Sequence, residues 1–500
     1  MSLCTEWQSM VDRAPQPCST MPRQAISPGA AMARFISPGR RAHRFGNSTY
    51  TLGSAPYRLP LVGNGVQLRT APLRFLDAIR ECGDITEFGL GQSSAYLLNN
   101  PELVHQVLVK DSRNFTKGIL FEKGRELLGN GIASSEGEFH TRQRRLVQPA
   151  FGRSNVVRHT EVMRSATLQA IDSWKDGRTV PVDRVMAEVT SAIATRCLFS
   201  TELARQDARQ IQRHMKRVFD GAGRRAYAPV DLWYRLPTRS NLAFDRSLET
   251  LHGLVDRIIA GYRRDAVRED DFLSMLLDAR DPDTGEAMSD AQVHDEVVTI
   301  LAGGTETSAS ALTWLFHLLA RHPETAARVH AEIDEVLEGR PVEFGDVAEL
   351  PITGRVVHEA LRLFPPIWLL PRTPVADTEI GGHRIAAGTQ VFFSPFALHR
   401  DRRWFPRPHR FDPDRWLPER AGDIPRGGYL PFGAGHRNCV GGTFGFTEIV
   451  VVLATVAQRW ALRTAPGARL SVTALTSLHL DGLDMDPSVR RTGPTPQPQE

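Results

Sequence analysis

A long, uninterrupted helical pattern between residues 289 and 321 constrains the fold of this chain more than any other feature. Ser289, followed three residues later by Gln292, forms a capping box, a usual start of a helix. The pattern continues to Arg321, and the following His322-Pro323 ends it. These 32 residues would span about 48 Å at about 1.5 Å per residue. A helix of this length crosses a whole domain, so the other elements must pack around it.

The middle of this helix reads "AGGTETSAS" at residues 302–310. Two adjacent glycines each cost a helix interior about 1 kcal/mol relative to alanine. Their position at the centre of the longest helix indicates that another group approaches the backbone closely there. A glycine-mediated crossing of two helices is the alternative explanation.

The rest of the chain predicts a mainly α protein with small β-sheets. Helices are expected at 72–82 and 101–111, each opening with proline, and amphipathic stretches run through 183–220. Strand patterns are short, at 85–90, 94–100 and a hairpin pair within 378–394. Despite 500 residues we find no linker, so we expect one domain over 51–490, with disordered tails at 1–50 and 491–500.

Composition narrows the class of protein. The net charge of +4 is spread along the chain, which argues against nucleic acid as a partner. The five cysteines are irregularly spaced without a CxxC pair, which argues against zinc ribbons and disulfide frameworks and favours a reducing cytoplasm. The longest apolar run, 449–457, is too short to span a bilayer, so we expect a cytoplasmic monomer without a membrane anchor.

Cys439 stands in the glycine-rich segment "FGAGHRNCVG", just before an apolar helix at 442–460. A helix N-terminus lowers the pKa of a nearby thiol, and the glycines allow backbone amides to point at the sulfur. One thiolate without neighbouring ligands does not build a zinc site, which needs three or four protein ligands. It can serve as the axial ligand of a haem, and a buried structural cysteine is the alternative.

At this point the sequence resembles a known family. "FGAGHRNCVG" is similar to the haem-ligand signature of cytochromes P450, with Phe432, Gly435, Arg437, Cys439 and Gly441 in place. "EALR" (359–362), "FDPDRW" (411–416) and "AGGTET" (302–307) resemble further motifs in the family's order, over nearly all of 51–490. The resemblance implies the P450 fold, a helical bundle around haem b, with Cys439 as the axial thiolate ligand of the iron.

The resemblance also implies roles for charged residues. Glu359 and Arg362 lie three apart on one helix face, and with Arg415 they would form a buried triad. The haem propionates would be held by four cations: His140, Arg144, Arg372 and Arg437. Any one of the latter could instead be a solvated surface base in this arginine-rich chain.

The central helix would supply the oxygen chemistry. Gly303 and Gly304 would open the helix beside the iron, and the Thr307 hydroxyl could bond to the Gly303 carbonyl or face bound oxygen. The resemblance assigns Glu306 and Thr307 as the proton-delivery pair; a helix-bending threonine beside a surface glutamate is the alternative. The pair favours monooxygenation with O2 over peroxide-dependent or isomerase chemistry.

No flavin or iron–sulfur domain fits in the remaining sequence, so we expect electrons from a separate ferredoxin and its NAD(P)H-dependent ferredoxin reductase. An arginine-rich stretch at 402–437 could present a cationic face to an acidic ferredoxin, although such runs are more often simply solvated. The arginines considered for this face are Arg402, Arg403, Arg407, Arg410, Arg420 and Arg426.

The positions where the family contacts substrate carry apolar side chains, which predicts a small hydrophobic substrate. They are Ile119, Leu120, Phe121, Leu301, Trp368, Leu369, Leu370 and Leu475. The segment at 136–151 is similar to bacterial enzymes that oxidise sesquiterpenes such as pentalenene, which favours a terpene hydroxylase of secondary metabolism. Fatty-acid or polyketide oxidation remains an alternative, as does a haem-binding sensor or carrier, which would not need Thr307 and Glu306.

Overall fold

The computed structural model describes residues 41–45, 48–200, 236–265 and 270–490, with scattered positions between 210 and 234. Residues 1–40 of the expected N-terminal tail and the whole expected C-terminal tail, 491–500, lie outside these residues. Residues 41–45 and 48–54 form paired strands, so the first sheet begins within the segment that the sequence predicted as a tail. Cys82 is disulfide-bonded, although the spacing of the cysteines argued against a disulfide framework.

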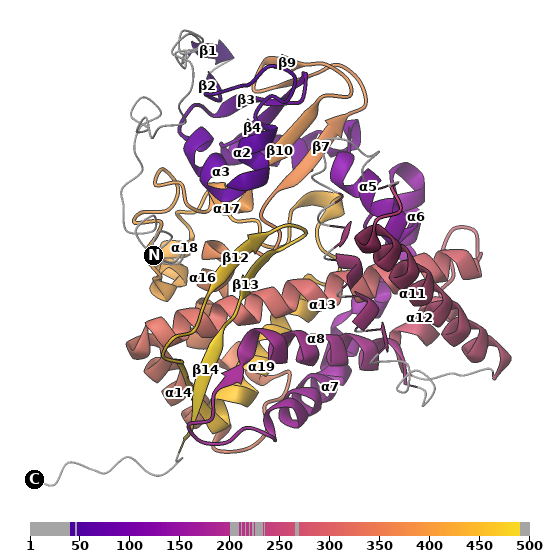
Figure 1. Cartoon of the computed structure of the whole chain (residues 1–500), viewed down its shortest axis with the longest axis vertical. Helices are drawn as coiled ribbons and strands as arrows, with labels where there is room; N and C mark the ends of the chain where they lie inside the picture. Colours follow the sequence, from indigo (N-terminus) through magenta and orange to yellow (C-terminus); the bar gives the residue numbers. More distant parts are fainter. Residues whose placement is uncertain are drawn as a thin grey trace, which may run out of the picture.

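Helices form most of the molecule and surround α13, which crosses its middle (Figure 1). The α-helices of the described residues are α2 Gly65–Thr70, α3 Pro72–Arg80, α4 Pro101–His105, α5 Ile119–Leu128, α6 Gly137–Val147, α7 Arg153–Ile171, α8 Val182–Leu198, α11 Arg239–Arg264, α12 Phe272–Asp278, α13 Asp290–Arg321, α14 Pro323–Leu337, α15 Asp346–Glu349, α16 Pro351–Leu363, α17 Pro395–Leu398, α18 Pro418–Ala421 and α19 Gly442–Arg459. Short π- and 3-10 turns join several of them: η1 Gln106–Lys110, η2 Ser112–Asn114, η3 Gln148–Phe151, η4 Pro413–Trp416 and η5 Gly435–Arg437.

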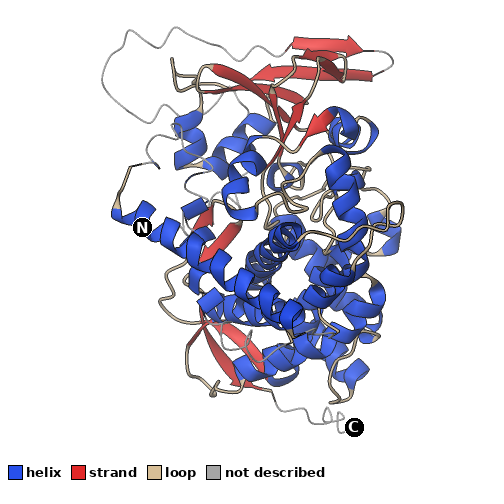
Figure 2. Cartoon of the chain, turned by 90° about the vertical axis from the view of Figure 1, so that its right-hand side faces the viewer, coloured by secondary structure: helices blue, strands red, loops and turns tan. Residues whose placement is uncertain are grey.

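The strands form one large sheet and three small ones. The large sheet has the order β1-β2-β3-β4-β10-β7-β5, and the others are β11-β14-β6, β12-β13 and β8-β9. Their bounds are β1 Arg41–Phe45, β2 Ser48–Ser54, β3 Ile85–Leu90, β4 Ser93–Leu98, β5 Phe115–Thr116, β6 Val180–Pro181, β7 Leu370–Pro374, β8 Thr378–Ile380, β9 His383–Ile385, β10 Gln390–Phe393, β11 Trp460–Thr464, β12 Ser471–Ala474, β13 Leu478–Asp481 and β14 Asp484–Val489. Figure 2 shows the large sheet at one end and the helices below it, as the mainly α prediction requires.

The hairpin expected within 378–394 is in fact a hairpin and a separate strand. β8 and β9 pair with each other, whereas β10 runs parallel to β4 and antiparallel to β7 in the large sheet. The sequence pattern could not assign β10 to the large sheet, because its partner β4 lies almost 300 residues earlier in the chain.

Helix α13 begins and ends where the sequence predicted. The Ser289 side chain accepts from the Gln292 amide, and the Gln292 side chain accepts from the Ser289 amide, which completes the capping box. Most of the helix is buried among α8, α16 and α19. Burial of this apolar surface, at about 25 cal/mol per Å², holds the helix rigidly in the core. Groups that α13 presents near its centre therefore have fixed positions.

The hairpin β12–β13 is attached to α13 at several points. The Leu478 carbonyl accepts from the Ser310 hydroxyl at 2.6 Å and from the Trp314 indole at 2.8 Å. The Leu478 amide donates to the Pro366 carbonyl at 2.9 Å. The turn of this hairpin is thus held against the middle of the long helix, in front of it in Figure 1.

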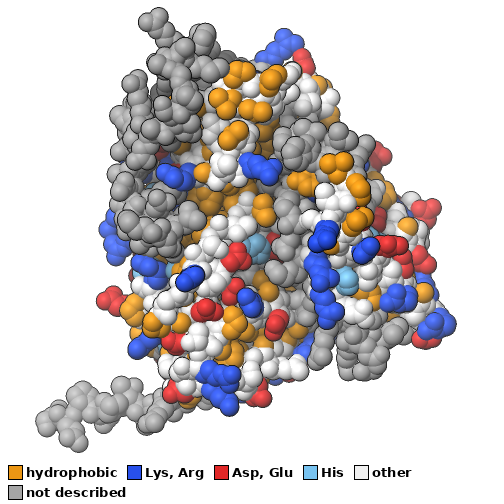
Figure 3. Space-filling view, viewed as in Figure 1, with side chains coloured by type: hydrophobic (Ala, Val, Ile, Leu, Met, Phe, Trp, Pro, Cys, Tyr) orange, Lys and Arg blue, Asp and Glu red, His pale blue; other side chains and the backbone are white. Residues whose placement is uncertain are grey.

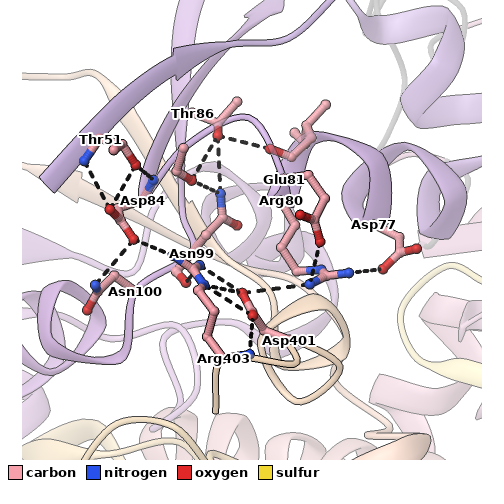
Figure 4. Close-up of polar contacts among 12 residues, drawn as sticks. Thr51, Asp77, Arg80, Glu81, Asp84, Thr86, Asn99, Asn100, Asp401 and Arg403 are labelled. Atoms are coloured by element: carbon pink, nitrogen blue, oxygen red, sulfur yellow. Dashed lines mark hydrogen bonds and ion pairs between the residues drawn. The ribbon is translucent and has the colours of Figure 1, made fainter. Parts of the chain in front are cut away.

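A buried polar network joins the large sheet to the segment after α17 (Figure 4). Asp84 accepts from the Thr51 amide and hydroxyl at 2.9 and 2.8 Å and from Arg403 Nη1 at 2.7 Å. Arg403 also pairs with Asp401, which lies 3.7 Å from Arg80 of α3. Since the side chains of Asp84, Arg80 and Asp401 are buried, this network fixes how the sheet meets the segment that leads to the cysteine loop.

No helix among the described residues is both long and apolar enough to cross a membrane. On the face shown in Figure 3, basic and acidic side chains are interspersed.

Candidate functional site

Cys439 lies in a tight loop that leads into α19. Its amide donates to the Phe432 carbonyl at 2.8 Å, which closes the loop. Gly433 and Gly435 have φ of +71° and +73°, a region that favours glycine. A Cβ at Gly435 would stand 2.0 Å from the Leu108 carbonyl oxygen, so a larger residue does not fit there. The loop presents an exposed Cys439 at its end.

Opposing effects act on the pKa of the Cys439 thiol. The protein packed around it raises the pKa, whereas a hydrogen bond from the Gly441 amide and the charge of Arg144 lower it. The protein crowded around the thiol prevails even though the side chain itself is exposed, so the pKa lies above its ordinary value, whereas the helix N-terminus predicted a lowering. A thiol in this environment needs a cation to hold it as the thiolate.

Arg144 of α6 is directed at the cysteine loop. It donates to the Asn438 carbonyl at 2.5 Å and to the Asn438 side-chain oxygen at 2.8 Å. A cavity of about 850 Å³ opens here, and its wall includes Arg144, Arg145, Phe432 and Cys439. Arg144 therefore positions the loop, and its predicted contact with a haem propionate stays a prediction.

A cluster of buried cations lies next to the loop. It comprises Lys117, His140, Arg372 and Arg437, and Glu136 pairs with Arg437 at 2.8 Å. Lys117 Nζ lies 3.4 Å from His140 Nδ1 and donates to the carbonyls of Ile132 and Ser135. We call these four residues the cation cluster; the sequence had pointed to all of them except Lys117.

Basic side chains are crowded together in the cation cluster, and this crowding and their burial disfavour their charged forms. Burial and the neighbouring cations lower the pKa of Lys117 to about 7, of His140 to about 3 and of Arg372 to about 10. His140 Nε2 and Arg437 Nε are buried without a hydrogen-bond partner among the described residues. Among the residues that the structure describes, the Arg372 guanidinium has one hydrogen-bond partner, the Pro371 carbonyl. Buried, unpaired donors of this kind are suited to hold an anion.

The centre of α13 is open on one side. Gly303 is exposed although Leu301, Ala302 and Thr305 beside it are buried, and a Cβ at Gly303 would meet no atom within 4 Å. The Thr307 hydroxyl donates to the Gly303 carbonyl at 2.7 Å, one of the two contacts expected for it. A Cβ at Gly304 would lie 3.7 Å from Ala194 of α8, so this second glycine is in ordinary contact with a neighbouring helix.

Glu306 points away from Thr307, toward the β12–β13 hairpin. Its Oε1 accepts from the hydroxyls of Thr476 at 2.7 Å and Ser477 at 3.0 Å, and His479 Nε2 lies 2.6 Å from the same oxygen. The carboxylate and the Thr307 hydroxyl therefore occupy different sides of the helix, and a proton passing between them needs water or a rotation of Glu306.

The Glu359–Arg362–Arg415 triad is assembled behind the site. Arg362 donates to both oxygens of Glu359 at 2.8 Å, and both side chains are fully buried. Arg415 Nε lies 3.6 Å from Glu359 Oε1, an ion pair without a hydrogen bond. Glu359 also accepts from the Asp412 amide and the Trp416 indole, each at 3.0 Å, so the cluster ties α16 to η4.

The expected substrate contacts divide into two groups. Leu301, Trp368 and Leu369 are packed in the core, and Trp368 donates to the Leu475 carbonyl at 3.0 Å. The others are half-buried and so present surface: Ile119, Leu120, Phe121, Leu370 and Leu475. Which of these side chains contact substrate stays a prediction.

Comparison with known proteins decides the family. The model of the family described as Cytochrome P450 matches residues 54–477. The chain is 44% identical over 437 residues to cyclooctatin synthase of Streptomyces melanosporofaciens, covering 87% of this chain and 95% of the relative.

The chain belongs to the cytochrome P450 family.

Two further relatives agree. Cyclooctat-9-en-7-ol 5-monooxygenase of the same organism is 44% identical, covering 84% of this chain and 92% of the relative. Pentalenene oxygenase of Streptomyces avermitilis is 38% identical, covering 86% and 96%. The solved structure of the cytochrome P450DA heme domain matches with a TM-score of 0.79 at 26% identity, over 88% of this chain and 97% of that one.

The P450 family uses haem b with an axial cysteine thiolate, and the residues of this chain fit that group. Cys439 is the exposed cysteine of the described residues, the cation cluster holds unpaired buried donors for carboxylates, and Gly303 leaves space beside α13. Because these three features have independent chemical requirements, their occurrence in one chain supports haem over a smaller ligand.

Sequence reasoning missed Lys117, His479 and Glu448. Glu448 is fully buried in α19 and accepts from the Ser308 hydroxyl at 2.5 Å, and burial raises its pKa to about 8. A lone glutamate in the apolar run "FTEIVVVLATVA" could have signalled this contact. Nothing in the local sequence signals His479, because its partner Glu306 lies 173 residues away.

Proposed function

We propose that this P450 is a monooxygenase that inserts one oxygen atom from O2 into a terpene. The observation that carries the proposal is the centre of α13, where the Thr307 hydroxyl is bonded to the Gly303 carbonyl beside an open stretch of backbone, and where the preceding residue, Glu306, is held on another side of the helix by the hairpin. An alcohol and a carboxylate beside the oxygen-binding position supply protons, which a sensor or carrier of haem does not need.

Each residue of the site has a defined task in this proposal. Haem, held by the Cys439 thiolate, would supply the oxygen-activating chemistry. The Gly441 amide and Arg144 hold the negative charge on the sulfur, and the cation cluster binds the propionates. Thr307 and Glu306 would supply protons beside the open stretch of α13 at Gly303.

The substrate is hydrocarbon-like. The half-buried candidates from α5, β7 and the hairpin are apolar, so they bind by removing apolar surface from water, at about 25 cal/mol per Å². The relatives at 44% and 38% identity are named for cyclooctat-9-en-7-ol, cyclooctatin and pentalenene. Since these names cover more than one skeleton, we propose a cyclic terpene of secondary metabolism without restricting the substrate to sesquiterpenes.

Electrons come from a ferredoxin and its NAD(P)H-dependent reductase in this proposal, and the enzyme acts as a cytoplasmic monomer. Of the arginines at 402–437, Arg403 and Arg420 are engaged in ion pairs with Asp401 and Asp412. The more exposed cations that remain for an acidic partner are Arg402, Arg407, Arg410 and Arg426.

Substrate binding and turnover test the proposal. We expect pentalenene or cyclooctat-9-en-7-ol to shift the haem spectrum toward the high-spin form and to give a hydroxylated product with a ferredoxin, its reductase, NADPH and O2. Palmitic acid serves as the comparison, since the apolar candidates include no cation for a carboxylate. A response to palmitic acid alone would overturn the terpene assignment, and the absence of NADPH-dependent O2 uptake with every compound would overturn monooxygenation.

A further inference from the structure

Glu306 is held by a polar cluster on the β12–β13 hairpin, which consists of Thr476, Ser477 and His479 and which we call the turn cluster. All three side chains contact the same oxygen, Oε1, at 2.6–3.0 Å. Ser477 also lies 2.7 Å from His479 Nε2, so the imidazole N–H is shared between the hydroxyl and the carboxylate. The turn cluster thus fixes Glu306 in a rotamer that faces the hairpin.

His479 stands between Glu306 and solvent. Its side chain is 30% exposed, whereas that of Glu306 is 13% exposed. Only Nε2 of the imidazole has a hydrogen-bond partner among the described residues, which leaves Nδ1 for water. An imidazole can take a proton on one nitrogen and release one from the other near neutral pH, whereas the hydroxyls of Thr476 and Ser477 hold their protons.

The position of His479 is fixed by its neighbour in the chain. Leu478 is hydrogen-bonded through its carbonyl to Ser310 and Trp314 of α13, and through its amide to Pro366. The imidazole is therefore anchored to the same helix that carries Glu306, so their 2.6 Å contact belongs to the packed core rather than to a loose surface turn.

We propose that His479 is the outer proton donor of Glu306. Nδ1 takes a proton from a hydronium ion, which leaves a water molecule, while the Nε2–H bond breaks and its proton passes to the Glu306 carboxylate at Oε1. The imidazole stays neutral overall and returns to its first tautomer by exchange with solvent. The proposal rests on the function proposed above, since it assumes that Glu306 then delivers this proton inward.

Two substitutions separate proton transfer from simple hydrogen bonding. His479→Gln keeps an N–H donor for Glu306 but cannot bind and release a proton, and His479→Ala removes both properties. Thr473→Val is the matched control, because Thr473 lies opposite His479 in the hairpin and its hydroxyl donates to Asp481, not to Glu306. Each variant must retain haem and the carbon monoxide spectrum of the wild type.

The first measurement needs no substrate. In the diamagnetic reduced carbon monoxide form, protein labelled with 15N-histidine should show a low-field ring N–H signal that disappears in His479→Gln, which assigns it. In Glu306→Gln this signal should move upfield, because a neutral amide is a weaker acceptor than a carboxylate. A signal unchanged by Glu306→Gln would show that the two side chains do not bond, and the proposal would be overturned.

The second measurement is the peroxide released per NADPH consumed. Positioned acid–base groups contribute at least about 100-fold to proton transfer. We therefore expect peroxide release to rise about tenfold or more in both His479 variants and to stay at the wild-type level in Thr473→Val. If His479→Gln matches the wild type, His479 is only a hydrogen-bond donor and the proposal is wrong. If the wild type accepts no terpene, the proposed function fails on its own, and substrate-free NADPH oxidation and the histidine signal still decide the role of His479.

Discussion

Glu359→Gln should remove the charge at the centre of the buried triad and prevent the chain from retaining haem. Glu359 accepts four hydrogen bonds, two from Arg362 and one each from the Asp412 amide and the Trp416 indole. Glutamine keeps the shape of the side chain but offers one acceptor oxygen in place of two. One Arg362 nitrogen therefore loses its partner, and the ionic part of the pairing is lost as well.

The structure sets the size of the effect. A hydrogen bond to a charged group contributes about 1.5–3 kcal/mol, and breaking a buried ion pair costs about 3–5 kcal/mol because the remaining charge stays buried. Arg362 keeps its hydrogen bonds to the carbonyls of His399, Pro408 and Arg410, so it does not become free to leave the core. We expect the free energy of unfolding to fall by about 3–5 kcal/mol.

A matched pair elsewhere in the chain supplies the control. Glu161 and Arg164 have the same i,i+3 spacing and also form an ion pair, but Glu161 is 62% exposed. Glu161→Gln should cost less than about 1 kcal/mol, because exposed pairs contribute little. Urea unfolding and the haem content of purified protein measure both variants. Equal losses in the two variants, or normal haem content in Glu359→Gln, would refute the reasoning.

Three other substitutions test separate parts of the site. Thr307→Ala should keep the haem spectrum and divert electrons to peroxide, measured as peroxide per NADPH; unchanged product yield would contradict its role. Arg372→Leu should weaken haem retention about 10- to 100-fold, since a charge-assisted hydrogen bond is lost. The haem-free variant should unfold at no lower urea concentration than the haem-free wild type, because it no longer buries a cation. Equal rates of haem transfer to apomyoglobin from variant and wild type would contradict this. Burial raises the pKa of Asp84, but hydrogen bonds from Thr51 and the charge of Arg403 outweigh it, so the pKa lies below 3.8. A depressed pKa adds stability that is lost as the pH falls through it. Asp84→Asn should therefore be less stable than the wild type at pH 7, and the two stabilities should converge as the pH falls below 3.8. A constant difference between their urea midpoints across that range would count against this.

Local patterns predicted the parts of the fold that depend on nearby residues. The capping box at Ser289, the stop at His322 and the proline starts of α3 and α4 appear as expected. Thr307 bonds to Gly303 because the two are four apart on one helix, a spacing that the sequence already fixes. The same holds for Glu359 and Arg362.

Contacts between distant segments required the structure. Arg144 holds Asn438, 294 residues later, because α6 meets the cysteine loop at that point, and its expected contact with a propionate stays a prediction. The place of Lys117 in the cation cluster and the contact of His479 with Glu306 were missed because no local pattern predicts which distant segments pack together. The pKa of Cys439 also depended on such packing, because the protein around the thiol raises it more than the Gly441 amide and the charge of Arg144 lower it.

The carbon monoxide difference spectrum of the reduced protein tests the central claim most directly. Cys439 as the thiolate ligand of haem iron should give the red-shifted Soret band of thiolate-bound haem in the wild type, and Cys439→Ser should bind haem without that band. A wild type that lacks the band, or a serine variant that keeps it, would contradict the account.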